Sequence, residues 1–241
     1  RDRIIEAQEL ETTLTDVDFY FLLDAYKLEY EILECWWATK RLLPKTFINF
    51  VLDKYVAKTK LKNVEGKEVE YSKEKIKFNA LYGMSVTNTI RDEVKYDNDL
   101  GLWEEIPLTN DEIREKLEKE KKKSFLSFAW GVWVTAYARD NLLRRVLELD
   151  DYVTYCDTDS IKLVEGYDKE GFRRYNDSVI ERLKAVSETL NIDYDRFSPE
   201  DIKGVSHTLG VFESETDKGR VHTYDRFITQ GAKKYAVEII S

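Results

Sequence analysis

A short acidic motif between two apolar runs limits the possible folds of this chain more than any other feature. It reads Tyr155-Cys156-Asp157-Thr158-Asp159-Ser160, with Val153-Thr154 before it and Ile161-Lys162-Leu163 after it. Apolar and β-branched residues on both sides are typical of strands, and the polar centre is typical of a turn. The stretch therefore predicts a β-hairpin whose tight tip carries Asp157 and Asp159.

Two carboxylates at this spacing indicate a cation site. Side chains at i and i+2 of an extended chain point to the same side, so Asp157 and Asp159 would repel each other without a positive charge between them. Mg²⁺ fits, since proteins usually hold it by one or two carboxylates together with substrate phosphates. A solvated turn is the alternative, because Asp and Thr are common turn residues. The rest of the chain has to decide between the two.

Composition excludes several other classes. The 241 residues are 42% hydrophobic, enough for a packed core, and no apolar run reaches the length of a membrane span. Two cysteines far apart and two histidines form neither a disulfide framework nor a zinc-site pattern. A cytosolic compartment fits this composition. The chain does not begin with methionine, and we expect it to be a piece of a longer protein.

The net charge is −9, but lysines are concentrated between residues 54 and 77, a segment here called the basic strip. Pro44 is followed by apolar residues at helical spacing, and the helix is expected to continue to Lys62. A turn with Gly66 and a second helix capped by Ser72 should complete an antiparallel helical hairpin. The lysines within the strip are Lys58, Lys60, Lys62, Lys67, Lys73 and Lys75. Such a strip on an acidic body suits local phosphate binding, with a solvated helix face as the alternative.

The second helix of this hairpin carries a row of chemically useful side chains. In Lys75-Ile76-Lys77-Phe78-Asn79-Ala80-Leu81-Tyr82-Gly83, Lys75, Asn79 and Tyr82 share a face, and Gly83 allows close approach. A cation, an amide and an aromatic ring in one row could bind a nucleoside triphosphate. An amphipathic helix with Tyr82 in the core and Lys75 in solvent explains the spacing equally well.

The rest of the sequence predicts helices and strands around the acidic hairpin. Residues 124–149 have apolar side chains around most of a helix, which predicts a buried helix packed under the sheet of that hairpin. The sequence predicts another helix over Arg173–Leu190, which ends at Asn191. It also predicts strands at residues 209–215 and 227–240. Within the last strand, Lys233 and Tyr235 would share one face and suit a nucleic-acid backbone, or Lys233 could guard an edge strand.

Taken together, these motifs resemble family B DNA polymerases, and among them the protein-primed type of phages and plasmids. Tyr155–Ser160 is similar to their Y-x-D-T-D-S motif C, Lys75–Gly83 to motif B, K-x-x-x-N-S-x-Y-G, and Lys233–Tyr235 to the K-x-Y motif. Gly131–Arg139 is similar to the palm helix before motif C, and Leu209–Glu213 to the strand that approaches K-x-Y. The resemblance covers roughly residues 44–241.

The resemblance implies an α+β fold, with an antiparallel palm sheet backed by helices, a helical fingers hairpin and the start of a thumb. The expected segments are a palm-associated segment (1–43), the fingers (44–95), the palm with motif C (96–226) and the palm–thumb border with K-x-Y (227–241).

The implied activity is DNA-directed DNA polymerisation, in which Mg²⁺, or Mn²⁺ in its place, assists transfer from a deoxynucleoside triphosphate to a primer 3′-hydroxyl. Asp157 and Asp159 would be the catalytic, metal-binding residues. Lys75, Asn79, Tyr82 and Gly83, with Lys58 or Lys60, would bind the nucleotide. Lys233 and Tyr235 would bind DNA. Primer–template DNA and deoxynucleoside triphosphates are the implied partners, with a priming protein left open, no membrane, and the host cytoplasm as the place if a phage encodes it.

Two departures limit what the resemblance implies. Ala80 replaces the usual serine of motif B, and no D-x-x-S-L-Y-P, the family's motif A with its partner aspartate, occurs in the sequence. We therefore expect this chain alone to be inactive. The rival interpretations are a non-catalytic nucleic-acid-binding remnant of a polymerase, another palm-type enzyme such as a nucleotidyl cyclase or reverse transcriptase, and a structural protein with a fortuitous D-T-D turn.

Overall fold

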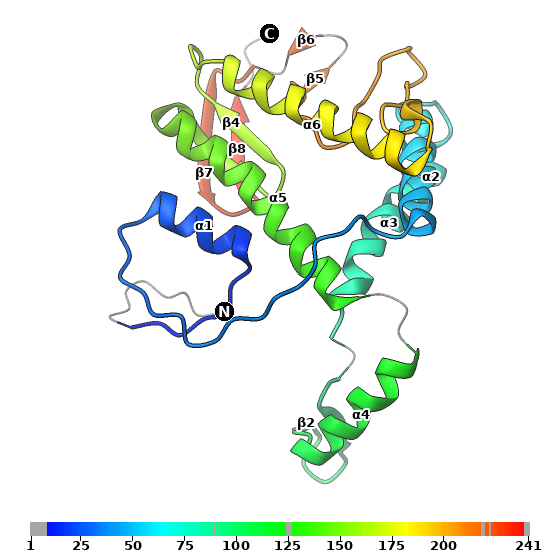
Figure 1. Cartoon of the computed structure of the whole chain (residues 1–241), viewed down its shortest axis with the longest axis vertical. Helices are drawn as coiled ribbons and strands as arrows, with labels where there is room; N and C mark the ends of the chain where they lie inside the picture. Colours follow the sequence, from blue (N-terminus) through cyan, green and yellow to red (C-terminus); the bar gives the residue numbers. More distant parts are fainter. Residues whose placement is uncertain (1–8, 89, 124–126, 218–219, 222, 239–241) are drawn as a thin grey trace. The chain divides into compact units, whose positions relative to one another are not determined.

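The structure, a computed structural model, describes residues 9–88, 90–123, 127–217, 220–221 and 223–238 (Figure 1). Its helices are α1 (Asp16–Ala25), α2 (Lys45–Leu61), α3 (Glu68–Ser85), α4 (Asn110–Lys123), α5 (Phe128–Leu149) and α6 (Glu170–Leu190), with short 3₁₀ helices η1 (Asp150–Tyr152) and η2 (Tyr194–Arg196). Its strands are β1 (Glu93–Asp97), β2 (Leu102–Ile106), β3 (Val153–Asp157), β4 (Ser160–Leu163), β5 (Thr216–Asp217), β6 (Arg220–Val221), β7 (Arg226–Gly231) and β8 (Lys234–Glu238). Consecutive strands pair into small antiparallel sheets, so the α+β class is confirmed.

The chain divides into two compact units. The first contains residues 1–78 and 135–241, and the second contains residues 79–134. This division differs from the four expected segments, because one boundary falls within α3 and another within α5. The four segments therefore stay a prediction about function. Among the described residues, no helix is long and apolar enough to cross a membrane.

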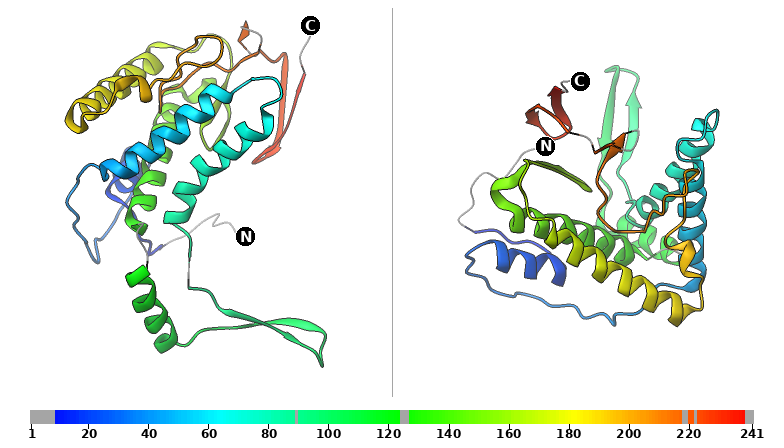
Figure 2. Two further views of the ribbon diagram at one scale, coloured as in Figure 1. Left: turned by 90° about the vertical axis from the view of Figure 1, so that its right-hand side faces the viewer. Right: turned by 90° about the horizontal axis from the view of Figure 1, so that it is seen from above.

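The expected helical hairpin is confirmed. α2 begins directly after Pro44, and a turn with Gly66 at φ 73° leads into α3. Figure 2 (left) shows the two helices side by side, and the Lys54 ammonium lies 3.0 Å from the Glu74 carboxylate across them. The prediction that Ser72 caps the second helix is wrong. α3 starts at Glu68, whose carboxylate accepts the Gly66 N–H at 3.2 Å and stabilises an earlier start.

The main core of the first unit lies where α2 meets the end of α6. Leu52 is 1% exposed and packs with Ile192 and Phe197. Asn191 ends α6 in the left-handed conformation, at φ 48°, which Asn tolerates better than most residues. The predicted end of this helix is confirmed. The turn places Ile192 in the core directly after the helix.

The long helix before the acidic hairpin is confirmed, but its burial on all sides is not. α5 runs from Phe128 to Leu149, and residues 124–126 of the predicted helix lie outside the described residues. Ala136, Leu142 and Leu149 are buried, whereas Tyr137 and Leu147 are exposed.

Arginines explain this one-sided burial of α5. Arg139 and Arg144 form ion pairs of 2.9 and 2.8 Å with Asp18 and Asp24 of α1, which lies beside α5 (Figures 1 and 2). On another side, an Arg145 N–H donates to the Gly171 carbonyl at the start of α6. Arg139 and Arg144 therefore place charged groups on the side of α5 that meets α1, and this side has no continuous apolar surface.

The predicted strands have a mixed outcome. The acidic hairpin is confirmed as β3–β4, with Asp157 opposite Ser160. Residues 209–215 form no strand. The Phe212 N–H donates to the Asn176 side chain at 2.8 Å, and the Asn176 amide donates back to the Phe212 carbonyl at 2.9 Å. A side chain thus satisfies the groups that a neighbouring strand would pair.

The last predicted strand is a hairpin, β7–β8. Its turn covers Ala232 and Lys233, and residues 239–240 lie outside the described residues. In the second unit, β1 and β2 form another hairpin on which Tyr96 and Trp103 pack at 5.2 Å. There the chain leaves α3 and returns to α5 in close contact. A Cβ on Gly131 would lie 2.2 Å from the Val86 side chain, so a larger residue would require that side chain to shift.

Candidate active site

The tip of the β3–β4 hairpin is a tight and strained turn. The Asp159 N–H donates to the Asp157 carbonyl at 2.6 Å, and Thr158 between them has φ 53°. A positive φ is unusual for a β-branched residue, and the left-handed conformation costs about 1–2 kcal/mol. The three residues do not form an extended segment, so the expectation based on side-chain alternation does not apply to Asp157 and Asp159.

The two carboxylates have different surroundings. Asp157 is half-buried, accepts a hydrogen bond of 2.9 Å from the Thr158 hydroxyl, and lies 3.7 Å from the Lys233 ammonium. Asp159 is exposed and lines a pocket of about 510 Å³. Asp157 therefore already has a cation beside it, and Asp159 is the carboxylate that a ligand in the pocket could reach.

This pocket, here called the Lys58 pocket, joins segments far apart in the sequence. Lys58 and Tyr55 come from α2, Phe78 from α3, Asp159 from the hairpin tip, and Glu213 from the loop before β5. The Lys58 ammonium lies 5.0 Å from the centre of the Tyr55 ring and 5.2 Å from that of Phe78. A cation and a carboxylate thus line one cavity of nucleotide-accommodating size.

The surroundings of Lys58 disfavour its charged form. Burial lowers the pKa of its ammonium, and repulsion from Lys62 and Lys75 lowers that pKa further. Asp159 and Glu213 act in the opposite direction. An anion bound near Lys58 would relieve the repulsion among the three lysines, which is the electrostatic property expected of a phosphate site.

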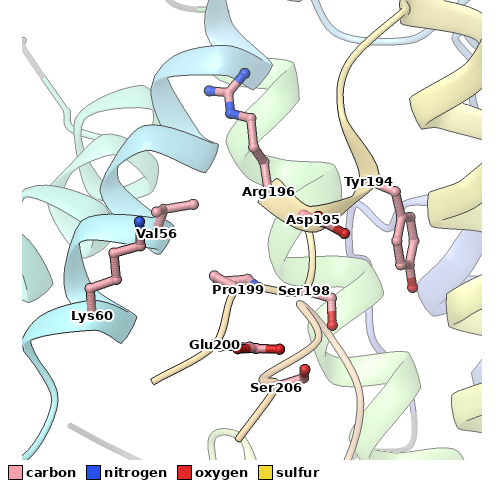
Figure 3. A pocket seen from close by; sticks show the side chains of 9 residues that line it. All are labelled: Val56, Lys60, Tyr194, Asp195, Arg196, Ser198, Pro199, Glu200 and Ser206. Carbon is pink, nitrogen blue, oxygen red and sulfur yellow. The ribbon is translucent and has the colours of Figure 1, made fainter. Parts of the chain in front are cut away.

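The sequence left Lys58 and Lys60 as equal candidates, and the structure separates them. Lys60 lines a second pocket of about 560 Å³, the Lys60 pocket, together with Glu200 and Ser206 (Figure 3). Arg196 also lines it, but its guanidinium is occupied by Asn49 at 2.6 Å and by Asp53 at 2.8 Å. Of the two lysines, only Lys58 shares a pocket with Asp159.

The remaining residues of the predicted nucleotide row lie on α3, as expected. Lys75 belongs to the first unit, while Asn79, Tyr82 and Gly83 belong to the second. Helical spacing puts Lys75, Asn79 and Tyr82 on one face of α3, and none of the four residues lines the Lys58 pocket. Tyr82 is 40% exposed, so the alternative in which it is a core residue is wrong.

The K-x-Y segment lies beside the acidic tip, although its predicted local structure is wrong. Lys233 is in the β7–β8 turn at φ 61°, outside either strand, so it does not alternate with Tyr235. Its N–H donates to the Tyr155 hydroxyl at 2.8 Å. The Tyr235 ring packs against Tyr155 at 5.4 Å and against Phe227 at 5.3 Å. Aromatic packing therefore joins the two hairpins.

Several residues of the site were not foreseen as site residues. The Tyr55 hydroxyl donates to the His207 carbonyl at 3.1 Å. Burial, with a smaller contribution from the negative charge of Glu213, raises the pKa of Tyr55 to about 12. The His207 ring nitrogens lie 2.9 Å from Glu213 and 3.3 Å from Asp201. The i, i+3 spacing of Tyr55 and Lys58 was a usable signal, but His207 and Glu213 lie in a loop without periodicity.

Mg²⁺ binding at the acidic tip stays a prediction. Within the described parts of the chain, no three His, Cys, Asp or Glu side chains are grouped so that they could hold a metal ion. Asp159 and Asp157 are the carboxylates of the hairpin tip, and Mg²⁺ typically takes its other ligands from water and substrate phosphates. These two aspartates are the residues that would hold the ion.

Comparisons with protein-family models, with curated protein sequences and with solved structures found no match for this chain. Any assignment of function therefore depends on the residues of the motifs and on the pocket that Lys58 and Asp159 line.

Proposed function

We propose that this chain forms part of a DNA-directed DNA polymerase of the family B type, which transfers a nucleotide from a deoxynucleoside triphosphate to a primer 3′-hydroxyl. The supporting observation is the convergence of three distant segments on one acidic tip. Lys58 shares a pocket with Asp159, and Lys233 lies 3.7 Å from Asp157. In this proposal, β3–β4 and β7–β8 with α5 and α6 belong to the palm, and α2–α3 to the fingers.

The side chains have separate roles in this proposal. Lys58, whose pKa the charge of Lys75 also lowers, neutralises the triphosphate. For Asn79, Tyr82 and Gly83, a nucleotide-binding role is what the resemblance to motif B implies. Lys233 and Tyr235 hold the primer backbone without reading its sequence. When bound, two Mg²⁺ ions stabilise the attacking and leaving oxygens. Asp159 and Asp157 would hold these ions together with the aspartate of motif A, which this sequence lacks.

A non-catalytic DNA-binding remnant is the second candidate. One observation favours it, since the Lys233 ammonium beside Asp157 neutralises this carboxylate without a metal ion. Such a protein would retain the basic and aromatic contacts to DNA and would not need Asp159.

Primer extension with Mn²⁺ tests the proposal. The chain is assayed alone and mixed with a separately made segment carrying D-x-x-S-L-Y-P, each with wild-type and Asp159→Ala protein. We expect synthesis only in the wild-type mixture. Synthesis by this chain alone would refute its expected inactivity. A folded mixture that binds primer–template and synthesises nothing would support the remnant, and synthesis that persists with Asp159→Ala would refute the role of that carboxylate.

A further inference from the structure

Lys58 sits against two aromatic rings that come from different helices. The ring of Tyr55 precedes it by one turn of α2, and the ring of Phe78 belongs to α3. The two ring centres are 5.8 Å apart, with planes tilted by 40°. Both centres lie within about 6 Å of the ammonium, the range in which a ring face attracts a cation.

The Tyr55 ring is fixed in place, and an ion pair connects the two helices that carry the rings. Tyr55 is 8% exposed, and its hydroxyl donates to the His207 carbonyl. The ion pair between Lys54 and Glu74, 3.0 Å long, connects α2 and α3 beside them. Burial and the hydrogen bond therefore fix the face of Tyr55 that meets Lys58 before any ligand binds.

Attraction by the rings offsets an unfavourable electrostatic setting. Lys58 is half-buried and experiences repulsion from Lys62 and Lys75. A flexible ammonium in this setting would move into solvent, since lysine has a long stem and a strongly hydrated head. Contact with two ring faces favours the inward position. For Lys60, by contrast, the described residues provide no aromatic ring at cation–π distance.

We propose that Tyr55 and Phe78 are positioning residues, which hold the Lys58 ammonium in the pocket for a phosphate group of the nucleotide. The proposal rests on the proposed function, because it assigns the ligand of this pocket to the polyphosphate class. It adds that the aromatic character of positions 55 and 78, in addition to their bulk, sets the affinity.

The test measures binding of inorganic tripolyphosphate to the whole chain by calorimetry. Phe78→Leu removes the ring and keeps an apolar side chain, while Phe78→Tyr and Tyr55→Phe keep the ring. We expect Phe78→Leu to weaken binding about fivefold. Phe78→Tyr should restore it, and Tyr55→Phe should lower it less than Phe78→Leu. In a Lys58→Ala background, Phe78→Leu should produce no further loss.

A second readout in the ligand-free chain separates positioning from folding. NMR titration of the Lys58 side chain should give a lower pKa in Phe78→Leu than in wild type, because the ring face stabilises the charged form, and Phe78→Tyr should restore it. An unchanged pKa of Lys58 in folded Phe78→Leu would overturn the proposal. So would a loss of tripolyphosphate affinity of equal size in the Lys58→Ala background.

The outcomes distinguish this proposal from the proposed function. If Phe78→Leu matches wild type in both readouts while primer extension depends on Asp159, the rings have no positioning role and the polymerase proposal stands. If wild-type chain binds no tripolyphosphate even at low salt, the phosphate role of Lys58 fails, and with it the positioning role of the rings.

Discussion

Two pockets of similar volume lie on the two sides of α2, and different side chains line them. The Lys58 pocket and the Lys60 pocket have comparable volumes of about 510 and 560 Å³. In the first, an ammonium rests on aromatic rings in a cavity that Asp159 also lines. In the second, the guanidinium of Arg196 is committed to Asn49 and Asp53. Side chains two residues apart on a helix point about 200° apart, so Lys58 and Lys60 lie on different sides of α2. The two lysines therefore have different neighbours and different chemical roles.

The largest expected effect is a loss of stability on weakening the core that anchors α2, because both pockets depend on the position of this helix. Leu52 is 1% exposed in the core that fixes α2 against Ile192 and Phe197. Leu52→Ala should lower the free energy of unfolding by about 2–5 kcal/mol. Urea denaturation measures it, with Ile48→Val at the edge of the same core as a milder control. A loss below about 1 kcal/mol would mean that α2 is not anchored by this core.

A medium effect on nucleotide affinity should come from replacing Lys58 and Lys60 by alanine, one at a time. Lys58→Ala should weaken binding of a deoxynucleoside triphosphate with Mg²⁺ about tenfold, because a charge-assisted contact to phosphate is lost. Lys60→Ala should change the affinity less than about twofold, through long-range charge alone. Calorimetry at two salt concentrations measures both. Equal losses in the two variants would erase the difference between the two sides of α2.

The smallest effect concerns the turn shared by the two pockets, since Ser206 lines one and His207 the other. The Val205 N–H, followed by other hydrogen bonds including that of His207, lowers the pKa of Asp201 below its usual value. A lowered pKa in the folded state stabilises the protein above the carboxyl's ordinary pKa, near 3.9.

This contribution should disappear as pH falls from about 4 through the lowered pKa of Asp201. Urea midpoints between pH 5 and 2.5 should therefore fall less steeply for Asp201→Asn than for wild type. Asp177→Asn, an exposed change on α6, is the control and should follow the wild-type slope. Parallel slopes for Asp201→Asn and wild type would contradict the assignment.

Local sequence signals predicted the elements well where one segment determines its own structure. The β3–β4 hairpin, the α2–α3 pair and the end of α6 at Asn191 all follow from turn residues and periodicity. Predictions failed where a distant side chain intervened. Residues 209–215 form no strand because Asn176, more than thirty residues earlier, takes up the Phe212 backbone groups. The burial of α5 could not be read from its composition, because its arginines pair with α1.

The candidate site was predictable in its residues but not in its arrangement. The acidic motif, the lysine strip and K-x-Y are visible in the sequence, and the resemblance supplied their expected roles. The sequence distinguishes Lys58 from Lys60 only by Tyr55 one helical turn before Lys58, since the rest of the distinction comes from the ring of Phe78 and from Asp159, which lies about a hundred residues away. Similarly, no local pattern predicts that Lys233 lies in a left-handed turn and that its N–H donates to the Tyr155 hydroxyl.

That hydrogen bond has a consequence for how the two hairpins come apart. The amide of an exposed turn ordinarily exchanges its proton with water almost freely, yet the Lys233 N–H is held by the Tyr155 hydroxyl at 2.8 Å. To release it, the β7–β8 turn must separate from β3, and the tilted, packed rings of Tyr155 and Tyr235 must separate with it. The acidic tip and the K-x-Y turn therefore open as one cooperative unit, and a single slowly exchanging amide reports when the two are together.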